Sequence, residues 1–214
     1  MSLSSDASPS QRLAQVPGPD FLVYIRHGQT DWNAEGRMQG QKDIPLNQVG
    51  EGQASGNGKR LAAFLKAEGM DPLSLDFVSS PLGRTRRTMD LVRAELGLAG
   101  HDYRLEPEVR EITFGDWEGS TLEELALEFP EKVAERRVDK WGFVPPNGES
   151  YEMLTGRIGA WLATVRQPTV VVAHGGVFRI VRGLLEGLET RHVPKLEAPQ
   201  DRMFLWRNGT GSWI

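Results

Sequence analysis

Residues 169–176 read Thr169-Val170-Val171-Val172-Ala173-His174-Gly175-Gly176, and this stretch decides the fold. Its first five residues are β-branched or apolar without interruption, which predicts a strand in the middle of a sheet, buried on both faces. The run ends abruptly at a histidine and two glycines, and a helical pattern follows over residues 177–188. A strand that leads directly into a helix is the repeating unit of an α/β protein.

Similar strand-to-helix units occur elsewhere in the chain. Apolar runs predict strands over residues 20–25 and 76–80, and a shorter strand over 103–106. Helical spacing predicts helices over 46–66, 82–96, 121–141 (in two pieces, the second starting at Pro130) and 150–165, where Ser150 is the expected N-cap. Residues 203–206 and 212–214 are expected to form a terminal hairpin around Asn208-Gly209. This alternation predicts an α/β protein, a three-layer α/β/α sandwich with a largely parallel central sheet.

The chain is long enough for one large domain, with 214 residues and no internal repeat. Residues 1–19 are rich in serine, proline and polar side chains, which predicts a tail of low intrinsic order. No strong linker follows residue 20. We therefore expect a single domain over residues 20–214.

Composition excludes several classes of protein. The 25 basic and 29 acidic side chains give a net charge of −4, so a nucleic-acid partner is not expected. Without cysteine the chain has no disulfides, no thiolate metal ligands and no cysteine nucleophile. No apolar run is long enough to cross a membrane, and the first residues lack the features of a secretory signal. We expect a soluble, cytoplasmic protein that does not bind membranes.

Histidines and arginines follow the predicted strands where a ligand is expected. In open α/β sheets, ligands bind beyond the carboxyl ends of the strands. His27, beside Arg26, ends the first strand, and His174 ends the strand at 169–173. Arg84 lies just after the strand at 76–80. Guanidinium groups offer forked donors to phosphate oxygens, and Gly175 lets a helix N-terminus approach an anion closely. A cationic pocket in a chain of negative net charge therefore predicts a site for a tetrahedral phosphate.

Five blocks of sequence follow one another along the chain, at residues 26–33, 40–46, 79–85, 110–119 and 173–179. Taken together and in this order, they resemble the histidine phosphatase superfamily in its phosphoglycerate-mutase-like branch (branch 1). The resemblance covers about residues 20–206. Gln29 is a departure from the glutamate that mutases usually carry, and phosphatases of the family often have glutamine there.

The resemblance implies a role for each site residue. His27 is the expected nucleophile and becomes phosphohistidine, while Arg26, Arg84 and His174 hold the phosphoryl group. Glu111 is expected to protonate the leaving oxygen and then to activate water. The further substrate-binding residues implied are Asn33, Gly40, Gln41 and Gly175. Neither a metal nor another cofactor is implied.

The chemistry of phosphate esters agrees with these implied roles. Phosphate monoesters hydrolyse very slowly unaided, and a covalent intermediate divides the reaction into two easier steps. Positioned cations stabilise the charge on the transferring group, and because no metal-ligand spacing such as HExxH is present, side chains must supply them. Arg26 and Arg84 should lower the pKa of His27 and keep it neutral for attack. Glu111 must be protonated to act as an acid, which predicts a mildly acidic or neutral pH optimum.

The sequence favours hydrolysis and leaves other functions open. The segment between Glu111 and His174 is shorter than in the mutases of the resembled branch, which use additional chain to exclude water. We therefore expect hydrolysis of a small phosphorylated metabolite. The alternatives are a cofactor-dependent phosphoglycerate mutase, a protein phosphohistidine phosphatase, a non-catalytic phosphate-binding module, and a metal-dependent hydrolase with His27, Glu111 and His174 as ligands. The candidates for binding further acidic groups are Arg37, Lys42, Lys140 and Arg179; neither the substrate nor the oligomeric state can be deduced.

Overall fold

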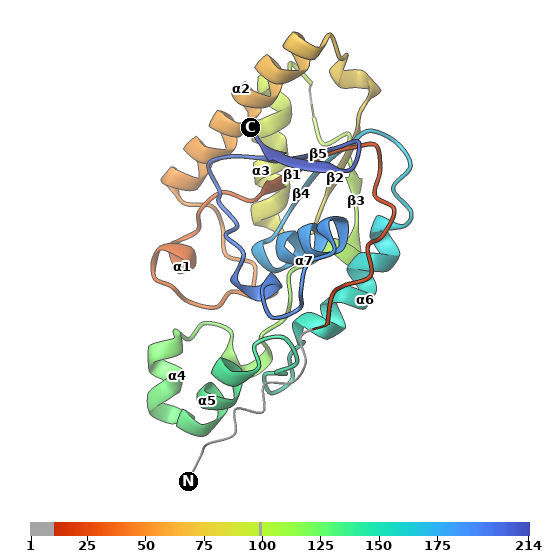
Figure 1. Cartoon of the computed structure of the whole chain (residues 1–214). Coiled ribbons are helices and arrows are strands. Elements are labelled where there is room, and N and C mark those ends of the chain that lie inside the picture. Colours follow the sequence, from red (N-terminus) through yellow and green to blue (C-terminus); the bar gives the residue numbers. More distant parts are fainter. Residues whose placement is uncertain (1–10, 99) are drawn as a thin grey trace.

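A computed structural model describes residues 11–98 and 100–214 of the chain. Its centre is a sheet of six strands in the order β3-β2-β4-β1-β5-β6 (Figure 1). The first four strands of the chain run parallel to one another, so the predicted, largely parallel sheet is confirmed. The fifth strand pairs antiparallel with the first, and the sixth pairs antiparallel with the fifth. The strands are β1 (Phe21–Arg26), β2 (Asp76–Ser79), β3 (Arg104–Leu105), β4 (Thr169–Ala173), β5 (Phe204–Arg207) and β6 (Thr210–Trp213).

The β4 strand lies between β1 and β2, as its uninterrupted apolar run predicts. Alternate residues of the strands point to opposite faces, and each face is buried beneath a different pair of helices. Helices α2 (Gln48–Glu68) and α3 (Gly83–Glu95) cover one face, and α6 (Tyr151–Leu162) and α7 (Gly175–Glu186) cover the other (Figure 1). The three-layer α/β/α architecture is therefore confirmed.

Local sequence explains where the main helices begin and end. The side chain of Asn47 caps α2 by accepting a hydrogen bond from Gly50, and Ser150 caps α6 through Met153, as expected. The α7 helix begins at Gly175, two residues before the predicted start. The reason is that His174, in extended conformation, is itself the N-cap residue. The backbone N–H groups of both glycines therefore lie in the first helical turn, where they have no partner within the helix.

A smaller part of the chain lies outside the three layers. It contains α4 (Leu122–Glu128) and α5 (Pro130–Val138), which are divided at Pro130 as predicted and lie away from the sheet (Figure 1). The short helix α1 (Asp31–Ala34) lies in the loop after β1. A separate apolar cluster holds the α4–α5 pair together, formed by Met38, Trp117, Leu125 and Val133.

The two ends of the chain pack onto the body in different ways. The predicted terminal hairpin is formed by β5 and β6, with Asn208 and Gly209 both at positive φ in the connecting turn. Of the polar segment 1–19, residues 1–10 lie outside the described residues. Residues 11–19, by contrast, lie along α7, because the side chains of Leu13 and Val16 pack on the apolar core. Their backbone N–H groups donate to the carbonyls of Leu188 and Leu184, respectively.

Across residues 11–98 and 100–214, no helix has both the length and the apolar composition needed to cross a bilayer.

Candidate active site

The two histidines that end strands lie beside each other. Arg26 at the end of β1 is aligned with Ala173 at the end of β4, so the residue after each strand reaches the same edge of the sheet. The backbone N–H of His27 donates to the carbonyl of Ala173 at 3.0 Å. The two imidazole rings meet edge to face, with 5.3 Å between their centres. The convergence expected from the sequence is thus present.

Arg84 joins the two histidines from the first turn of α3. Its Nε donates to His27 Nε2 and its Nη2 to His174 Nδ1, each at 3.3 Å. The remaining donors of this guanidinium reach the carbonyls of Gly40 at 2.8 Å and Lys42 at 2.5 Å. Only 1% of Arg84 is exposed, so a charge is held in the interior by two rings and two carbonyl groups.

The hydrogen bonds of His27 determine which of its nitrogens can attack. Its Nδ1 lies 2.7 Å from the carbonyl of Gly28, which can only accept, so Nδ1 carries the proton. Because arginine can only donate, Nε2 must present its lone pair toward Arg84. Burial lowers the pKa of His27 well below its usual value, and the charges of Arg84 and Arg26 lower it further. A neutral ring with an unprotonated Nε2 is the nucleophilic form of histidine.

His174 is also neutral and forms hydrogen bonds with Arg84, Ser80 and Tyr24. Burial, followed by the charge of Arg84, lowers the pKa of His174 well below its usual value. Since Nδ1 accepts from Arg84, Nε2 carries the proton and donates to Ser80 Oγ at 2.8 Å. The hydroxyl of Tyr24 donates to the carbonyl of His174 at 2.7 Å and accepts from its N–H at 3.0 Å.

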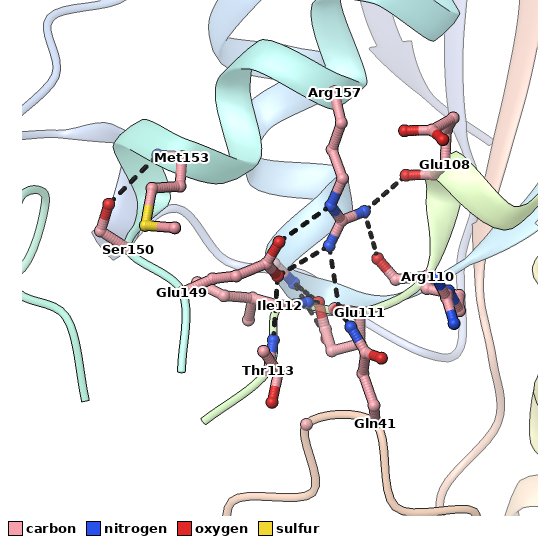
Figure 2. Close-up of polar contacts among 12 residues, drawn as sticks. Gln41, Glu108, Arg110, Glu111, Ile112, Thr113, Glu149, Ser150, Met153 and Arg157 are labelled. Atoms are coloured by element: carbon pink, nitrogen blue, oxygen red, sulfur yellow. Dashed lines mark hydrogen bonds and ion pairs between the residues drawn. The ribbon is translucent and has the colours of Figure 1, made fainter. Parts of the chain in front are cut away.

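Glu111 lies across from the histidines, at the N-terminus of α7. Its carboxylate accepts two contacts from the backbone N–H of Gly176, at 3.0 and 3.1 Å, and one from Ile112 at 3.0 Å. The free N–H groups and the positive end of the helix dipole favour a carboxylate there. The backbone carbonyl of Glu111 accepts from Gln41 Nε2 and from Arg157 (Figure 2).

Arg26 points toward the start of α7 beside a second guanidinium. A Cβ placed on Gly175 would lie 3.3 Å from Arg26 Nε and 3.4 Å from Arg179 Nη1, so glycine allows both arginines to approach. Arg26 donates through Nη1 to Ala198, but its buried Nε has no partner. Burial, together with the charge of Arg179, lowers the pKa of Arg26 to about 10. Two adjacent guanidiniums with an unused donor favour an anion.

These groups surround a cavity of about 180 Å³. The sequence-predicted residues that line it are Arg26, His27, Asn33, Gly40, Arg84, Glu111 and Gly175. His174 and Gln41 are not among its lining residues. His174 lies behind Arg84, and Gln41 holds the backbone of Glu111. Of the proposed specificity residues, Arg37 and Arg179 line the cavity, whereas Lys42 and Lys140 do not.

Several residues of the site were not identified from the sequence. Gln200 donates through Nε2 to the carbonyl of His27 and to Asn33 Oδ1, both at 3.0 Å. No local pattern marks this glutamine, because it reaches the site from a loop more than 160 residues away along the chain. Ser80 and Tyr24 did carry a signal, since each lies in a predicted strand near its carboxyl end.

The arrangement does not favour a metal ion. In the part of the chain that the structure describes, no three histidine, aspartate or glutamate side chains gather as metal ligands. In addition, the unprotonated nitrogens of His27 and His174 both face the guanidinium of Arg84. A second cation placed there would be repelled by the first.

Comparisons with known proteins agree with this geometry. The family model described as "Histidine phosphatase superfamily (branch 1)" matches residues 22–203. An uncharacterised phosphatase of Bacillus subtilis is 33% identical over 172 residues, 78% of this chain and 77% of the relative. A 2,3-bisphosphoglycerate-dependent phosphoglycerate mutase of Beijerinckia indica is 31% identical over 204 residues, 91% of this chain and 94% of the relative. The solved structure of the α-ribazole phosphatase from Shigella flexneri is 26% identical, with a TM-score of 0.74 over 91% of this chain and 94% of that one.

Proposed function

The chain belongs to the histidine phosphatase superfamily, branch 1, and from this membership we propose that His27 carries the phosphoryl group during hydrolysis of a small phosphorylated metabolite. The activity is that of a phosphoric monoester hydrolase. The observation that carries the proposal is the neutral ring of His27, whose lone pair on Nε2 faces a guanidinium beside the cavity. A nucleophile next to a fixed cation suits attack on a phosphate dianion.

In the first step, His27 Nε2 gives up the hydrogen bond from Arg84 Nε and attacks phosphorus, and the bond between phosphorus and the ester oxygen breaks. Glu111, protonated, gives its proton to the departing oxygen, and the alcohol leaves. Arg84 and Arg26 stabilise the charge on the equatorial oxygens, and His174 supports this cluster from behind Arg84.

In the second step, a water molecule attacks the phosphohistidine. Glu111, now a carboxylate, takes one proton from this water, the nitrogen–phosphorus bond breaks, and inorganic phosphate leaves. His27 Nε2 recovers its lone pair, while the carbonyl of Gly28 keeps the proton on Nδ1 throughout. Each residue ends the cycle in the state in which it began.

We assign the remaining residues to substrate binding. Asn33 and Gly40 line the cavity and can contact the phosphoryl or ester oxygens. Gly175 provides space at the helix N-terminus, and Gln41 contributes through the backbone of Glu111. The proposal requires neither metal nor other cofactor, takes residues 20–214 as one catalytic domain, and places the enzyme in the cytoplasm with no nucleic-acid partner.

A phosphoglycerate mutase is the second candidate, because one relative of 31% identity over most of both chains carries that name. A mutase must protect its phosphohistidine from water, and the short segment between Glu111 and His174 favours hydrolysis instead. The two functions differ in product. The test is an assay of phosphate release against isomerisation of 3-phosphoglycerate, with and without 2,3-bisphosphoglycerate. Isomerisation that outpaces release would support the mutase.

A screen of phosphate release over a panel of phosphorylated metabolites tests the proposed activity. The substrate is expected to be small, and one solved structure similar to this chain is named an α-ribazole phosphatase. A His27→Ala variant should lose turnover and retain binding of inorganic phosphate. Turnover that survives this substitution would exclude His27 as the nucleophile, and turnover abolished by EDTA would restore the metal-dependent alternative.

A further inference from the structure

An ion pair outside the cavity, between Arg157 and Glu149, holds the backbone on both sides of Glu111. We propose that Arg157, together with Glu149, is a positioning residue for proton transfer by Glu111. The inference rests on the proposed function, in which Glu111 protonates the leaving oxygen. Neither Arg157 nor Glu149 lines the cavity, so they act through the segment that carries Glu111 (Figure 2).

The segment around Glu111 has no regular secondary structure of its own. It runs from the 3₁₀ turn Pro107–Val109 to the 3₁₀ turn Gly115–Trp117 and pairs with no strand. Its carbonyl groups therefore need partners from elsewhere in the protein. Such partners hold the backbone that carries Glu111, whereas the N–H groups of Gly176 and Ile112 bind its carboxylate.

Arg157 supplies those partners from α6. Its Nη1 donates to the carbonyls of Glu108 and Arg110, the latter at 2.7 Å, and its Nη2 donates to the carbonyl of Glu111 at 3.1 Å (Figure 2). One planar guanidinium thus binds three carbonyls in four consecutive residues. Lysine, with a single compact ammonium group, cannot reproduce this fork.

Glu149 completes the clamp on the other side of Glu111. It accepts from Arg157 Nε at 3.2 Å and Nη2 at 3.0 Å, and also from the backbone N–H of Thr113 at 3.1 Å (Figure 2). In return, the N–H of Glu149 donates to the carbonyl of Thr113 at 2.9 Å. Residues 108–111 are therefore held by Arg157, and residue 113 by Glu149.

The clamp is anchored to a rigid element. Arg157 lies on α6, whose Leu154, Ile158 and Trp161 are buried against the core. The side chains of Arg157 and Glu149 are only 18% and 20% exposed, so water competes weakly for the pair. Any movement of residues 108–113 must break several charge-assisted hydrogen bonds. The position of the Glu111 carboxylate is thereby coupled to the core of the protein.

The dependence of the rate on the leaving group separates positioning of the acid from general support of the fold. p-Nitrophenolate leaves as a stable anion and hardly needs a proton, whereas the alkoxide of 3-phosphoglycerate must be protonated. The quantity to compare is kcat/KM, because it reports the steps up to formation of phosphohistidine and not the later attack of water. Arg157→Ala should lower kcat/KM for 3-phosphoglycerate ~10- to 100-fold and for p-nitrophenyl phosphate less than ~3-fold.

Two further variants make the test independent of folding. Arg157→Lys keeps the charge opposite Glu149 and should retain the selective loss, because it lacks the fork. Glu149→Gln should show the same selectivity with a smaller loss of kcat/KM. If thermal melting shows that Arg157→Ala is not folded, the result for Glu149→Gln tests the inference in its place. The matched control is Arg182→Ala, which removes an ion pair of similar exposure on α7 and should leave kcat/KM unchanged for both substrates.

Glu111→Gln distinguishes failure of this inference from failure of the proposed function. If Glu111→Gln is selective for the leaving group and the Arg157 variants are not, Arg157 has only a structural role and the inference is wrong. An equal loss for both substrates, or no loss, in the Arg157 and Glu149 variants would also overturn it. If Glu111→Gln itself is not selective, the assignment of Glu111 as the acid fails, and this inference fails with it.

Discussion

His27 and His174 illustrate how individual residues are controlled by their surroundings. Both residues are buried, and both rings accept a hydrogen bond from the same guanidinium. Burial and this neighbouring charge act in the same direction, so the pKa of each histidine is lower in the folded protein than in the unfolded chain. We therefore expect the ring of His27 to stay neutral at pH values where an exposed histidine would be protonated.

The stability of the protein should depend on pH because of these two residues. Above the ordinary histidine pKa of 6.5, both rings are neutral in the folded and unfolded states and stability is unaffected. Below it, the unfolded chain binds protons that the folded protein does not, so each histidine lowers the free energy of unfolding by up to ~1.4 kcal/mol per pH unit. Urea unfolding between pH 7 and pH 5 measures this loss.

A variant without the two rings provides the comparison. His27→Gln with His174→Gln should unfold with a smaller dependence on pH below 6.5 than the original protein. Parallel pH curves for the double variant and the original protein would contradict the prediction.

Tyr24 shows how a buried hydroxyl supports the site from behind. It satisfies both backbone groups of His174 at the junction of β4 and α7, and only 1% of the residue is exposed. Tyr24→Phe leaves the N–H of His174 buried without a partner, so we expect a loss of about 1–3 kcal/mol in the free energy of unfolding. The matched control is Tyr103→Phe, which removes a hydroxyl near the surface and should cost less. An equal loss in the two variants by denaturant unfolding would contradict this prediction.

Helix α2 meets the loop after β1 backbone to backbone. A Cβ placed on Gly50 would lie 2.1 Å from the carbonyl oxygen of Gln29, and one on Gly28 would lie 2.2 Å from the carbonyl oxygen of Gly50. No side chain fits between these segments. The first turn of α2 therefore fixes the loop that follows His27, and glycine at position 50 has a packing function.

Two glycines of the same helix should respond to alanine in opposite ways. Gly50→Ala forces backbone apart and should destabilise the protein by more than ~1 kcal/mol and lower kcat. Gly52→Ala meets no atom within 4 Å and should be neutral or stabilising by up to ~1 kcal/mol, because alanine favours helix. Thermal melting and the phosphate-release assay measure both effects. The packing interpretation fails if the two variants behave alike.

The segment 11–19, which precedes the first strand, packs against helix α7 near the other end of the chain. It runs beside α7, and its Leu13 and Val16 extend the core on the α6–α7 side of the sheet. A Cβ on Gly183 of α7 would lie 3.0 Å from Leu13 Cδ1, which shows how closely the two pack. Helix α7 is thus covered on its outer side by residues that precede the first strand.

Removing these apolar contacts should lower stability without changing the chemistry. Leu13→Ala with Val16→Ala is expected to reduce the free energy of unfolding by ~2 kcal/mol, because both side chains are only partly buried. The kcat should remain within about twofold, since neither residue lines the cavity. Denaturant unfolding and steady-state kinetics are the measurements. A large fall in kcat with unchanged stability would show instead that the segment influences the site directly.

Local patterns predicted the main elements of this protein and several of its candidate site residues. The uninterrupted run of β4 marked the central strand, and the breaks at Pro130 and at Asn208-Gly209 marked a helix boundary and a hairpin turn. His27, His174 and Arg84 could be identified because they follow strands or begin a helix at one edge of a parallel sheet. Such features depend on the backbone preferences of each residue type and on the spacing of apolar residues. Both involve only a few neighbouring residues and can therefore be recognised in a single sequence.

Contacts between distant segments could only come from the folded structure. Glu111 lies in a segment without regular structure, and the site receives Gln200 and the support of Arg157 from other parts of the chain. The same holds for residues 11–19, whose polar composition predicts low order although two apolar side chains find a place on α7. In each case the contact depends on which unpaired carbonyl or apolar surface the packed layers leave nearby. That depends on three-dimensional packing, which produces no periodic pattern in the sequence.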